Sequence, residues 1–316
     1  MLNKLEKIKG LLLNSPLVKI GAEYNGKKKI VYAKCEWYSL TGSVKDRVAY
    51  QIFLDAIKKG EINDRTKVCE VTSGNMGISI CAISNILGLE CTIILPKNMS
   101  EERKKLLTSY GANLVIVDDF KTAFKLCNEF ENKGYFCPHQ FENKSNFDCH
   151  YNLTAPMIYE KIKNKDVKNF VCGVGTSGTL SGVGTFLKEK GLSVTALEPF
   201  SSRILTNKKP FLKHSLQGLA DEIVPKLYQS AVPDKIVQIK DEDAIFMAQK
   251  LCKELSLGVG ISSGANFLAS ILSEQNSVTI FADDNKKYLS TNLTQPCKSQ
   301  YENKIKLTDI EYVWLS

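Results

Sequence analysis

The sequence has few of the features that mark membrane, secreted or metal-binding proteins. It contains no apolar run of about 18 residues, so we expect no membrane span. Its start, MLNKLEKIKGLLL, has only three consecutive leucines before polar residues return, which does not fit a secretory signal. Its three histidines, His139, His150 and His214, have no second ligand at a useful spacing. We therefore predict no metal site.

Regular cysteine spacing is also missing. The ten cysteines are scattered along the chain and form no C-x-x-C pair. Disulfide frameworks and zinc sites usually show such spacings. Their absence indicates reduced and mostly buried thiols, as in proteins of reducing compartments. We therefore expect a cytoplasmic protein.

Charge of one sign is not concentrated anywhere. The 42 basic and 34 acidic residues leave a net charge of +8, spread along the chain. A nucleic-acid surface would need clustered basic residues, so we expect neither nucleic acid nor membrane as a partner. A length of 316 residues suffices for two lobes with their own cores. The sequence has no internal repeat, and its polar stretches, 142–149 and 201–214, are predicted to be loops.

Short apolar runs alternate with helical patterns, which is typical of parallel sheets covered by helices. The pattern appears twice along the chain and therefore predicts an α/β protein with two lobes. Strands are expected at residues 67–71, 91–95, 114–117, 170–172 and 194–197. Helices are expected at residues 75–87 and 100–111, and between the last two strands, ending near Gly191.

The segment TGSVKDR, residues 41–47, places a lysine at the start of a predicted helix. Apolar residues at Val48, Ile52 and Ala56 give the helical spacing, with Lys45 in the first turn. The positive end of the helix dipole disfavours a charged ammonium, which helps to supply the neutral amine that a Schiff base requires. A lone lysine is usually a solvated surface charge, so this signal needs support from other segments.

Three glycine-rich turns come just before predicted helices, and two of them also follow predicted strands. EVTSGNMG, residues 70–77, offers backbone N–H groups and short hydroxyls that suit a carboxylate or a phosphate. A plain capped turn between a strand and a helix would look the same. GVGISSGA, residues 258–265, opens another helix and could be only a cap.

The third turn, GVGTSGT at residues 173–179, has two interpretations. It satisfies G-x-G-x-x-G, and Glu198 lies 20 residues beyond Gly178, so it also matches the dinucleotide-binding fingerprint. This leaves an NAD-dependent oxidoreductase open. Its crowded hydroxyls suit the three oxygens of a terminal phosphate monoester better than a bridging pyrophosphate.

Taken in order, six segments resemble the cysteine synthase and cystathionine β-synthase family of fold type II pyridoxal-phosphate enzymes. They are SLTGSVKDR, EVTSGNMG, GVGTSGT, QGLADEIVP, GISSGA and KYLST. Agreement extends from Pro16 to about Leu293. The resemblance implies two three-layer α/β lobes like those of the tryptophan synthase β subunit. The smaller, mobile lobe would be 40–149 with 1–15, and the larger, cofactor-binding lobe 150–316 with 16–39.

The resemblance also implies a role for each motif. Lys45 would hold pyridoxal 5'-phosphate as a Schiff base and later move the Cα proton. Asn75 would contact the ring hydroxyl of the cofactor, and Ser262 would face its pyridine nitrogen. Three residues would grip the substrate carboxylate: Thr72, Ser73 and Gln140. One loop would hold the cofactor phosphate: Gly175, Thr176, Ser177, Gly178 and Thr179.

The serine predicted opposite the ring nitrogen favours one class of reaction. A hydroxyl cannot keep that nitrogen protonated as an aspartate would, so charge at Cα is poorly delocalised. Expulsion of a β-leaving group should then outrun transamination and racemisation. Addition of a nucleophile to the resulting α-aminoacrylate completes a β-replacement.

The chain departs from the sulfide-using synthases in the loop after Gln217. Those enzymes usually carry small residues there, as in QGIGAGF, whereas this chain carries Asp221 and Glu222. An anion near the cleft would repel hydrosulfide, but it could deprotonate water or accept a proton from a thiol. Two smaller departures are Met76 in place of a hydroxyl residue and an added acid at Asp284.

These departures lead to a hypothesis on the direction of the reaction. We expect release of hydrogen sulfide from L-cysteine, with water or a second thiol giving L-serine or a thioether. Cysteine synthesis from O-acetylserine and sulfide is the main alternative. A catalytically silent binding protein is disfavoured because Lys45, Asn75 and Ser262 are all retained. The family further implies a homodimer, and some members dock serine acetyltransferase.

Overall fold

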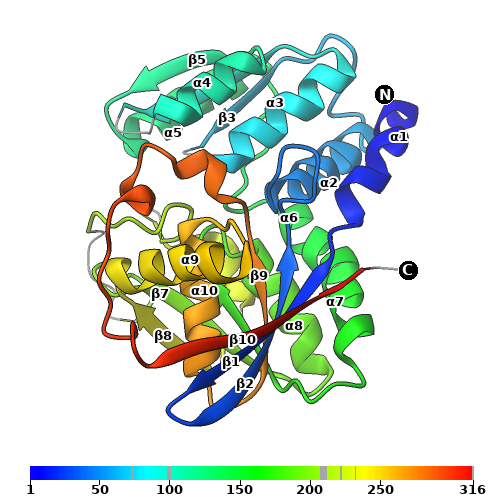
Figure 1. The fold of residues 1–316 in the computed structure, drawn as a ribbon. Helices are drawn as coiled ribbons and strands as arrows, with labels where there is room; N and C mark the ends of the chain where they lie inside the picture. The colour runs from blue at the N-terminus through cyan, green and yellow to red at the C-terminus, as the bar shows by residue number, and fades with distance from the viewer. Residues whose placement is uncertain (73, 98–100, 207–211, 221–222, 232, 315–316) are drawn as a thin grey trace.

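The strands form two separate sheets. The computed structural model describes residues 1–316 except 73, 98–100, 207–211, 221–222, 232 and 315–316. Within the described residues, the larger sheet has seven strands and the smaller three (Figure 1). The larger sheet has the order β10 (Ile305–Val313), β1 (Leu17–Tyr24), β2 (Lys27–Cys35), β9 (Ser277–Phe281), β6 (Asn169–Gly173), β7 (Ser193–Pro199) and β8 (Lys235–Ile239). The smaller sheet has the order β3 (Val68–Val71), β4 (Cys91–Pro96) and β5 (Asn113–Val117).

Most strand pairs are parallel, as the sequence predicts. Every pair in the smaller sheet is parallel. In the larger sheet, β2, β9, β6, β7 and β8 are joined by parallel pairs. The antiparallel pairs are β1 with β2 and β1 with β10, at one edge of that sheet. Parallel sheets need helical crossovers, which place helices on both faces.

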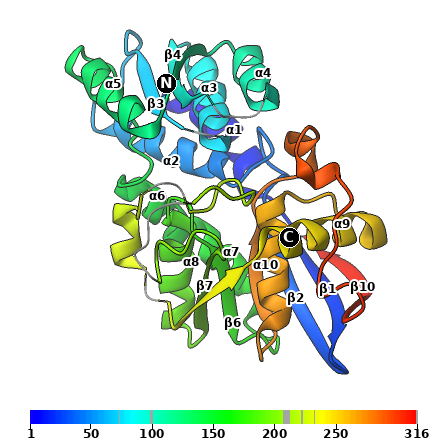
Figure 2. The ribbon, with the colours of Figure 1, turned by 90° about the vertical axis from the view of Figure 1, so that its left-hand side faces the viewer.

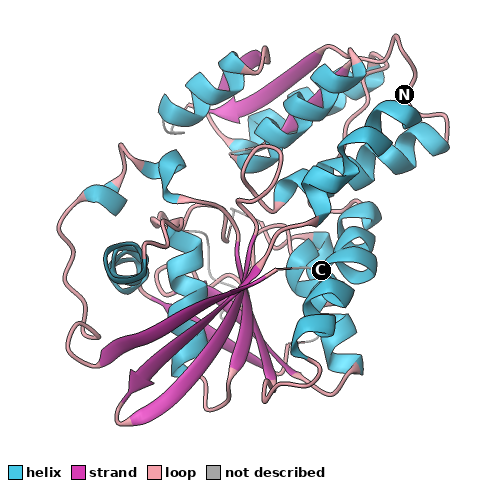
Figure 3. Ribbon diagram, turned by 45° about the vertical axis from the view of Figure 1, so that its right-hand side comes forward, coloured by secondary structure: helices cyan, strands magenta, loops and turns pink. Residues whose placement is uncertain are grey.

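The helices cover both faces of both sheets. Around the smaller sheet lie α1 (Leu2–Leu13), α2 (Lys45–Lys58), α3 (Asn75–Leu87), α4 (Glu101–Ser109) and α5 (Phe120–Asn132). The rest are α6 (Lys144–Cys149), α7 (Ala155–Ile162), α8 (Gly178–Glu189), α9 (Asp241–Leu255) and α10 (Ile261–Leu272). Figure 2 shows the smaller sheet with its helices above the larger one, and Figure 3 shows helices on either side of the larger sheet. Among the helices that the structure describes, none combines the length and apolar character of a membrane-spanning segment.

The alternation of strand residues explains the three layers. In β4, Ile93 packs with residues of α2 and α3, while Ile94 packs with residues of α5. In β6, Val171 faces the core under α9 and α10, and Phe170 faces the core under α7 and α8. Successive side chains of a strand point to opposite faces, so each sheet is buried on both sides. The predicted fold class is confirmed, while the lobe boundaries at 40–149 and 150–316 stay a prediction.

Within the described residues, the predicted elements occur where expected, with one exception. Residue 100 of the predicted helix and residues 207–211 of the predicted loop at 201–214 lie outside the described residues. Helix α3 ends at Leu87 and is followed by Gly88, whose φ of 82° is a left-handed cap that suits glycine. The stretch 142–149 was predicted to be a loop, and this prediction is wrong because Lys144–Cys149 forms α6. The side chain of Asn143 accepts a hydrogen bond from the Ser145 N–H and so caps this helix. The polar composition there reflects the Asn143 cap and two polar side chains, Ser145 and Asn146, that are buried in the fold.

Candidate active site

A cavity lies where the carboxyl ends of three strands meet. Its walls include Thr72 after β3, Gly173 at the end of β6 and Ala282 after β9. The empty volume is ≈ 870 Å³, counting the space at its mouth. Ligands of parallel α/β sheets bind at this edge, because the loops that follow the strands meet there. Its other lining residues include most of the predicted site: Lys45, Asn75, Gln140, Gly175, Thr176, Ser177, Thr179 and Ser262.

Lys45 is the first residue of α2, as the sequence predicts. Its Nζ donates a hydrogen bond of 3.2 Å to the Thr176 hydroxyl. Thr176 also accepts a hydrogen bond of 3.0 Å from the Asn146 side-chain amide. The amine of the smaller sheet's helix α2 therefore meets the glycine-rich loop that follows β6.

The glycine-rich loop turns sharply into α8. Ser177 has a φ of 69°, in the left-handed region, and Gly178 begins the helix. A Cβ on Gly178 would collide with the side-chain amide of Asn146, and one on Gly175 would collide with the Gly218 carbonyl. These close approaches require glycine at both positions. The loop thus leaves helix N–H groups and hydroxyls facing the cavity, as an anion site needs.

A buried polar chain supports the loop from below. The Thr179 hydroxyl lies 3.2 Å from Nε2 of His150, whose Nδ1 lies 3.0 Å from the Thr154 hydroxyl. Arg47 Nη1 donates to that same hydroxyl, and Arg47 pairs with Glu36 at 2.7 Å. Burial and the nearby cations lower the pKa of His150 well below its usual value, so it is neutral. His150 therefore orients a hydroxyl of the loop through Nε2 and is itself held through Nδ1.

A second hydrogen-bonded group lies at the start of α3. The Asn75 amide donates to Asp283 Oδ2 at 2.7 Å, and the Tyr288 hydroxyl donates to the same oxygen at 2.6 Å. Burial raises the pKa of Asp283, against the opposing effects of Lys287 and its hydrogen-bond donors. Among the described residues, Asn75 Oδ1 and Asp283 Oδ1 have no hydrogen-bond partner although both are buried. Buried polar atoms without a partner usually mark a position where a ligand or an ordered water binds.

The two described residues predicted to grip a carboxylate also line the cavity. Thr72 follows β3, and Gln140 donates through Nε2 to the Val71 carbonyl at 3.2 Å. Glu70 lies behind them, and its Oε2 accepts a hydrogen bond from the Gln140 N–H. Burial and the nearby Cys127 raise the pKa of Glu70 to about 8. Ser73, the third predicted residue, lies outside the described residues.

Ser262 lies in the first turn of α10 and lines the cavity. The same helix is fixed to β6 by Asn266, whose Oδ1 accepts a hydrogen bond of 2.8 Å from the Gly173 N–H. The Asn266 amide also donates to the Ile280 carbonyl at 2.8 Å. Two strands of the larger sheet thus fix the helix on which Ser262 lies.

The loop that carries the predicted acids reaches the cavity. Gln217, Gly218 and Leu219 line it, and the Ala220 N–H donates to the Val174 carbonyl at 2.7 Å. The Ala220 carbonyl lies 3.2 Å from Nε2 of His214. The next two residues, Asp221 and Glu222, lie outside the described residues.

Several site residues were missed by sequence reasoning. Arg103 and Asp283 line the cavity, and Asn146 joins the Gln140 carbonyl to the glycine-rich loop. Arg103 is buried at 5% exposure, with its guanidinium carbon 5.8 Å from the Tyr288 ring centroid. Its polar neighbours in KNMSEERKK gave no signal of burial. The sequence suggests Asp284 as an added negative charge at the site. In the structure, its carboxylate accepts a hydrogen bond from the Lys286 N–H and does not line the cavity.

The cavity fits pyridoxal 5'-phosphate. The loop at 175–179 offers hydroxyls and a helix N-terminus to a phosphate, and Lys45 offers an amine to the aldehyde. Asn75 Oδ1 is a buried acceptor without a partner, as expected where a ring hydroxyl would bind. The apolar side chains of Leu219 and Ile280 line the walls, which suits an aromatic ring.

Comparisons with known proteins agree with this assignment. The family described as "Pyridoxal-phosphate dependent enzyme" matches residues 8–283. Cysteine synthase B of Campylobacter jejuni is 37% identical over 303 residues, which cover 91% of this chain and 98% of that protein. A crystal structure of a hydrogen sulfide-producing enzyme from Fusobacterium nucleatum is 36% identical, with a TM-score of 0.93 and 100% coverage of both chains. An aspartate-to-asparagine variant of that enzyme, with an α-aminoacrylate intermediate, has a TM-score of 0.92 and 36% identity over 98% of this chain and 99% of its own.

The family match decides between the two interpretations of the glycine-rich loop at 173–179. The match covers the lysine segment, both strand-to-helix turns and α10. The cofactor is therefore pyridoxal 5'-phosphate, and the interpretation as an NAD-dependent oxidoreductase is wrong. The chain belongs to the pyridoxal-phosphate-dependent enzymes of fold type II, and within them it is cysteine synthase-like.

Proposed function

We propose that this enzyme releases hydrogen sulfide from L-cysteine and adds water or a second thiol, giving L-serine or a thioether. The observation that carries the proposal is the loop QGLADEI. Its first part is anchored at the cavity through Ala220, and two carboxylates, Asp221 and Glu222, follow at once. The Fusobacterium nucleatum relative, described as hydrogen sulfide-producing, supports this direction.

The described side chains supply what such a reaction needs. The bound cofactor supplies the electron sink that makes the Cα proton of an amino acid acidic. Lys45 lies at the cavity to carry the cofactor and to move that proton. Thr72 and Gln140, with Ser73, would hold the substrate carboxylate at the start of α3. Holding the substrate in one orientation fixes which Cα bond breaks.

Asp221 and Glu222 would act on the second half of the reaction. A carboxylate can take the proton from water or from a neutral thiol as it attacks the β-carbon. The same negative charge would keep hydrosulfide, an anion, away from the site. Both effects favour sulfide release over sulfide uptake.

Cysteine synthesis from O-acetylserine and sulfide is the second candidate. It is favoured by relatives such as the cysteine synthases of Campylobacter jejuni and Staphylococcus aureus, which are 37% and 34% identical to this chain. The two candidates share the same cofactor and differ in leaving group and nucleophile.

The test is a product analysis of the holoenzyme. L-Cysteine alone should yield hydrogen sulfide together with L-serine or a thioether, identified by mass spectrometry. O-Acetylserine with sulfide should give L-cysteine much more slowly. If only the second mixture turns over, the enzyme is a cysteine synthase and the proposed direction is wrong.

Substitution of the two acids separates their roles. Asp221→Asn and Glu222→Gln should slow product formation from L-cysteine, by about 100-fold for whichever residue is the general base. Glu61→Gln, at an exposed position after α2, removes the same charge far from the loop and should change nothing. Unchanged rates and products in both loop variants would remove the acids from the mechanism.

Three properties expected from the family remain part of this proposal. The enzyme would be a homodimer in the cytoplasm, and serine acetyltransferase would be its protein partner. Sedimentation of the purified holoenzyme, alone and with that acetyltransferase, tests the first and the last.

A further inference from the structure

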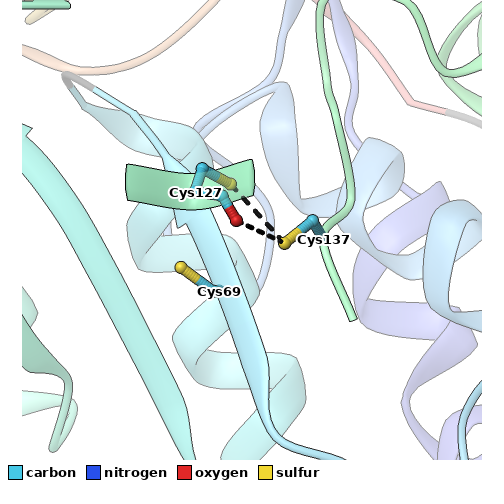
Figure 4. A group of neighbouring side chains, drawn as sticks. All are labelled: Cys69, Cys127 and Cys137. Carbon is cyan, nitrogen blue, oxygen red and sulfur yellow. Dashed lines mark hydrogen bonds between the residues drawn. The ribbon is translucent and has the colours of Figure 1, made fainter. Parts of the chain in front are cut away.

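Three cysteines from separate segments meet in the core of the smaller sheet's domain. Cys69 lies in β3, Cys127 in α5, and Cys137 in the extended segment that follows α5 (Figure 4). Their Sγ atoms all lie within 4.8 Å of one another. Cys127 Sγ donates to Cys137 Sγ at 3.5 Å, and Cys137 Sγ donates to the Cys127 carbonyl at 3.8 Å. We call these three residues the thiol cluster.

The thiol cluster is closed off from solvent. The exposures of Cys69, Cys127 and Cys137 are 0%, 2% and 6%. Apolar side chains surround them: Val71, Ile94 and Ala123. Of the His, Cys, Asp and Glu side chains that the structure describes, only these three thiols form the group. The nearby Glu70 carboxylate is occupied by the backbone N–H groups of Val71 and Gln140.

The spacing of the sulfur atoms suits one ion bound by three thiolates. With metal–sulfur bonds of about 2.3 Å, three sulfur atoms arranged trigonally around one ion are about 4.0 Å apart. One observed separation is 3.5 Å and the others are no more than 4.8 Å, so they are compatible with that value. Only small side-chain movements would therefore be needed.

The number and type of donors decide which ion fits. Structural zinc is almost always bound by four ligands, and the thiol cluster offers three. Copper(I) is a soft ion that prefers thiolates, and three sulfur donors complete a trigonal site. We propose that Cys69, Cys127 and Cys137 bind one copper(I) ion. This site goes beyond the family's chemistry and revises the expectation of no metal.

Binding needs proton release but no change of oxidation state. Three Cu–S bonds form, the three S–H bonds break, and the protons pass to solvent.

Copper binding would reach the active site through two short segments. Cys69 lies three positions before Thr72, and Cys137 lies three positions before Gln140. Gln140 is hydrogen-bonded to Glu70 and Val71 of the same strand as Cys69. An ion that repositions the sulfur atoms would shift both carboxylate-binding residues. Because these residues would hold the substrate carboxylate, copper binding would change KM. This change in KM rests on the proposed function, whereas copper binding itself does not.

The test is anaerobic titration of the holoenzyme with copper(I) against bathocuproine disulfonate, a coloured copper(I) chelator. We expect one tightly held copper(I) per chain in the wild type, and at least tenfold weaker binding in Cys69→Val and in Cys137→Ala. Cys81→Ala is the matched control, because Cys81 and Cys91 form a buried thiol pair, also at 3.5 Å, in the same lobe. It should retain the bound ion.

The outcomes separate the site from the proposed function. Copper held equally well by the thiol-cluster variants, or lost only in the control, would overturn the proposal. So would retention of zinc(II) but not copper(I). The absorption of the bound cofactor shows whether each variant is folded, and sulfide release from L-cysteine is measured on the same samples. An enzyme that fails to release sulfide yet binds copper at the cluster would refute the function and leave the copper site standing.

Discussion

A buried lysine makes the stability of this protein depend on pH within a defined window. The ammonium of Lys34 donates to the Ser15 carbonyl at 2.7 Å and lies 3.9 Å from the Glu36 carboxylate. Its side chain has 0% exposure. Burial lowers the pKa of Lys34 from 10.5 to about 8, although Glu36 opposes the shift. In the unfolded chain the pKa returns to about 10.4.

The sign and size of the effect follow from proton linkage. Between pH 8 and 10.5 the unfolded chain holds a proton on Lys34 that the folded protein has released. The free energy of unfolding therefore rises with pH across this window. At about 1.4 kcal/mol per pH unit, the rise amounts to about 3 kcal/mol. Below pH 8 both states are protonated, so the contribution is constant.

The assay compares urea unfolding of the wild type and Lys34→Met at several pH values. Other titrating groups are common to both proteins, so subtracting the two free energies of unfolding isolates Lys34. The difference should be flat below pH 8 and grow by about 3 kcal/mol in favour of the wild type up to pH 10.5. Lys58→Met, at an exposed helix position, should show no such change. A flat difference for Lys34→Met would refute the reasoning.

Three further predictions concern the active site. Glu70, whose pKa is about 8, ionises as the pH rises and would then repel a substrate carboxylate near Gln140. KM for L-cysteine should therefore rise above pH 8 in the wild type but not in Glu70→Gln. Parallel pH profiles of KM in the two proteins would contradict this. Asn146→Ala removes hydrogen bonds to the Gln140 carbonyl and to Thr176 of the glycine-rich loop. The free energy of unfolding measured in urea should therefore fall by about 2–5 kcal/mol. Gly178→Ala forces a Cβ against the Asn146 amide, and an overpacking cost of about 1–3 kcal/mol should weaken cofactor binding about 10-fold or more in dialysis. Gly10→Ala, with nothing near its Cβ, is the control.

Local signals explain what the sequence could predict. The turns at 70–77 and 173–179 combine a strand end, glycines and the start of a helix, and each of these is encoded within a few residues. Lys45 was found for the same reason, because the apolar spacing that follows it defines α2. The parallel sheets follow from the alternation of strands and helices.

Long-range contacts explain what the sequence could not predict. Asn146 serves the site by bonding to Thr176, 30 positions away, and it lies in a polar stretch without apolar periodicity. Arg103 sits among charged residues, and only folding shows that its side chain is buried. The thiol cluster joins cysteines from three segments, so no spacing motif could reveal it.

The most direct test of the central claim is the ratio of two specificity constants measured on one preparation of holoenzyme at one pH. One is kcat/KM for hydrogen sulfide release from L-cysteine, and the other is kcat/KM for L-cysteine formation from O-acetylserine with sulfide. We predict that the first exceeds the second and that both depend on Lys45. A larger value for L-cysteine formation would contradict the proposed direction and identify the enzyme as a cysteine synthase.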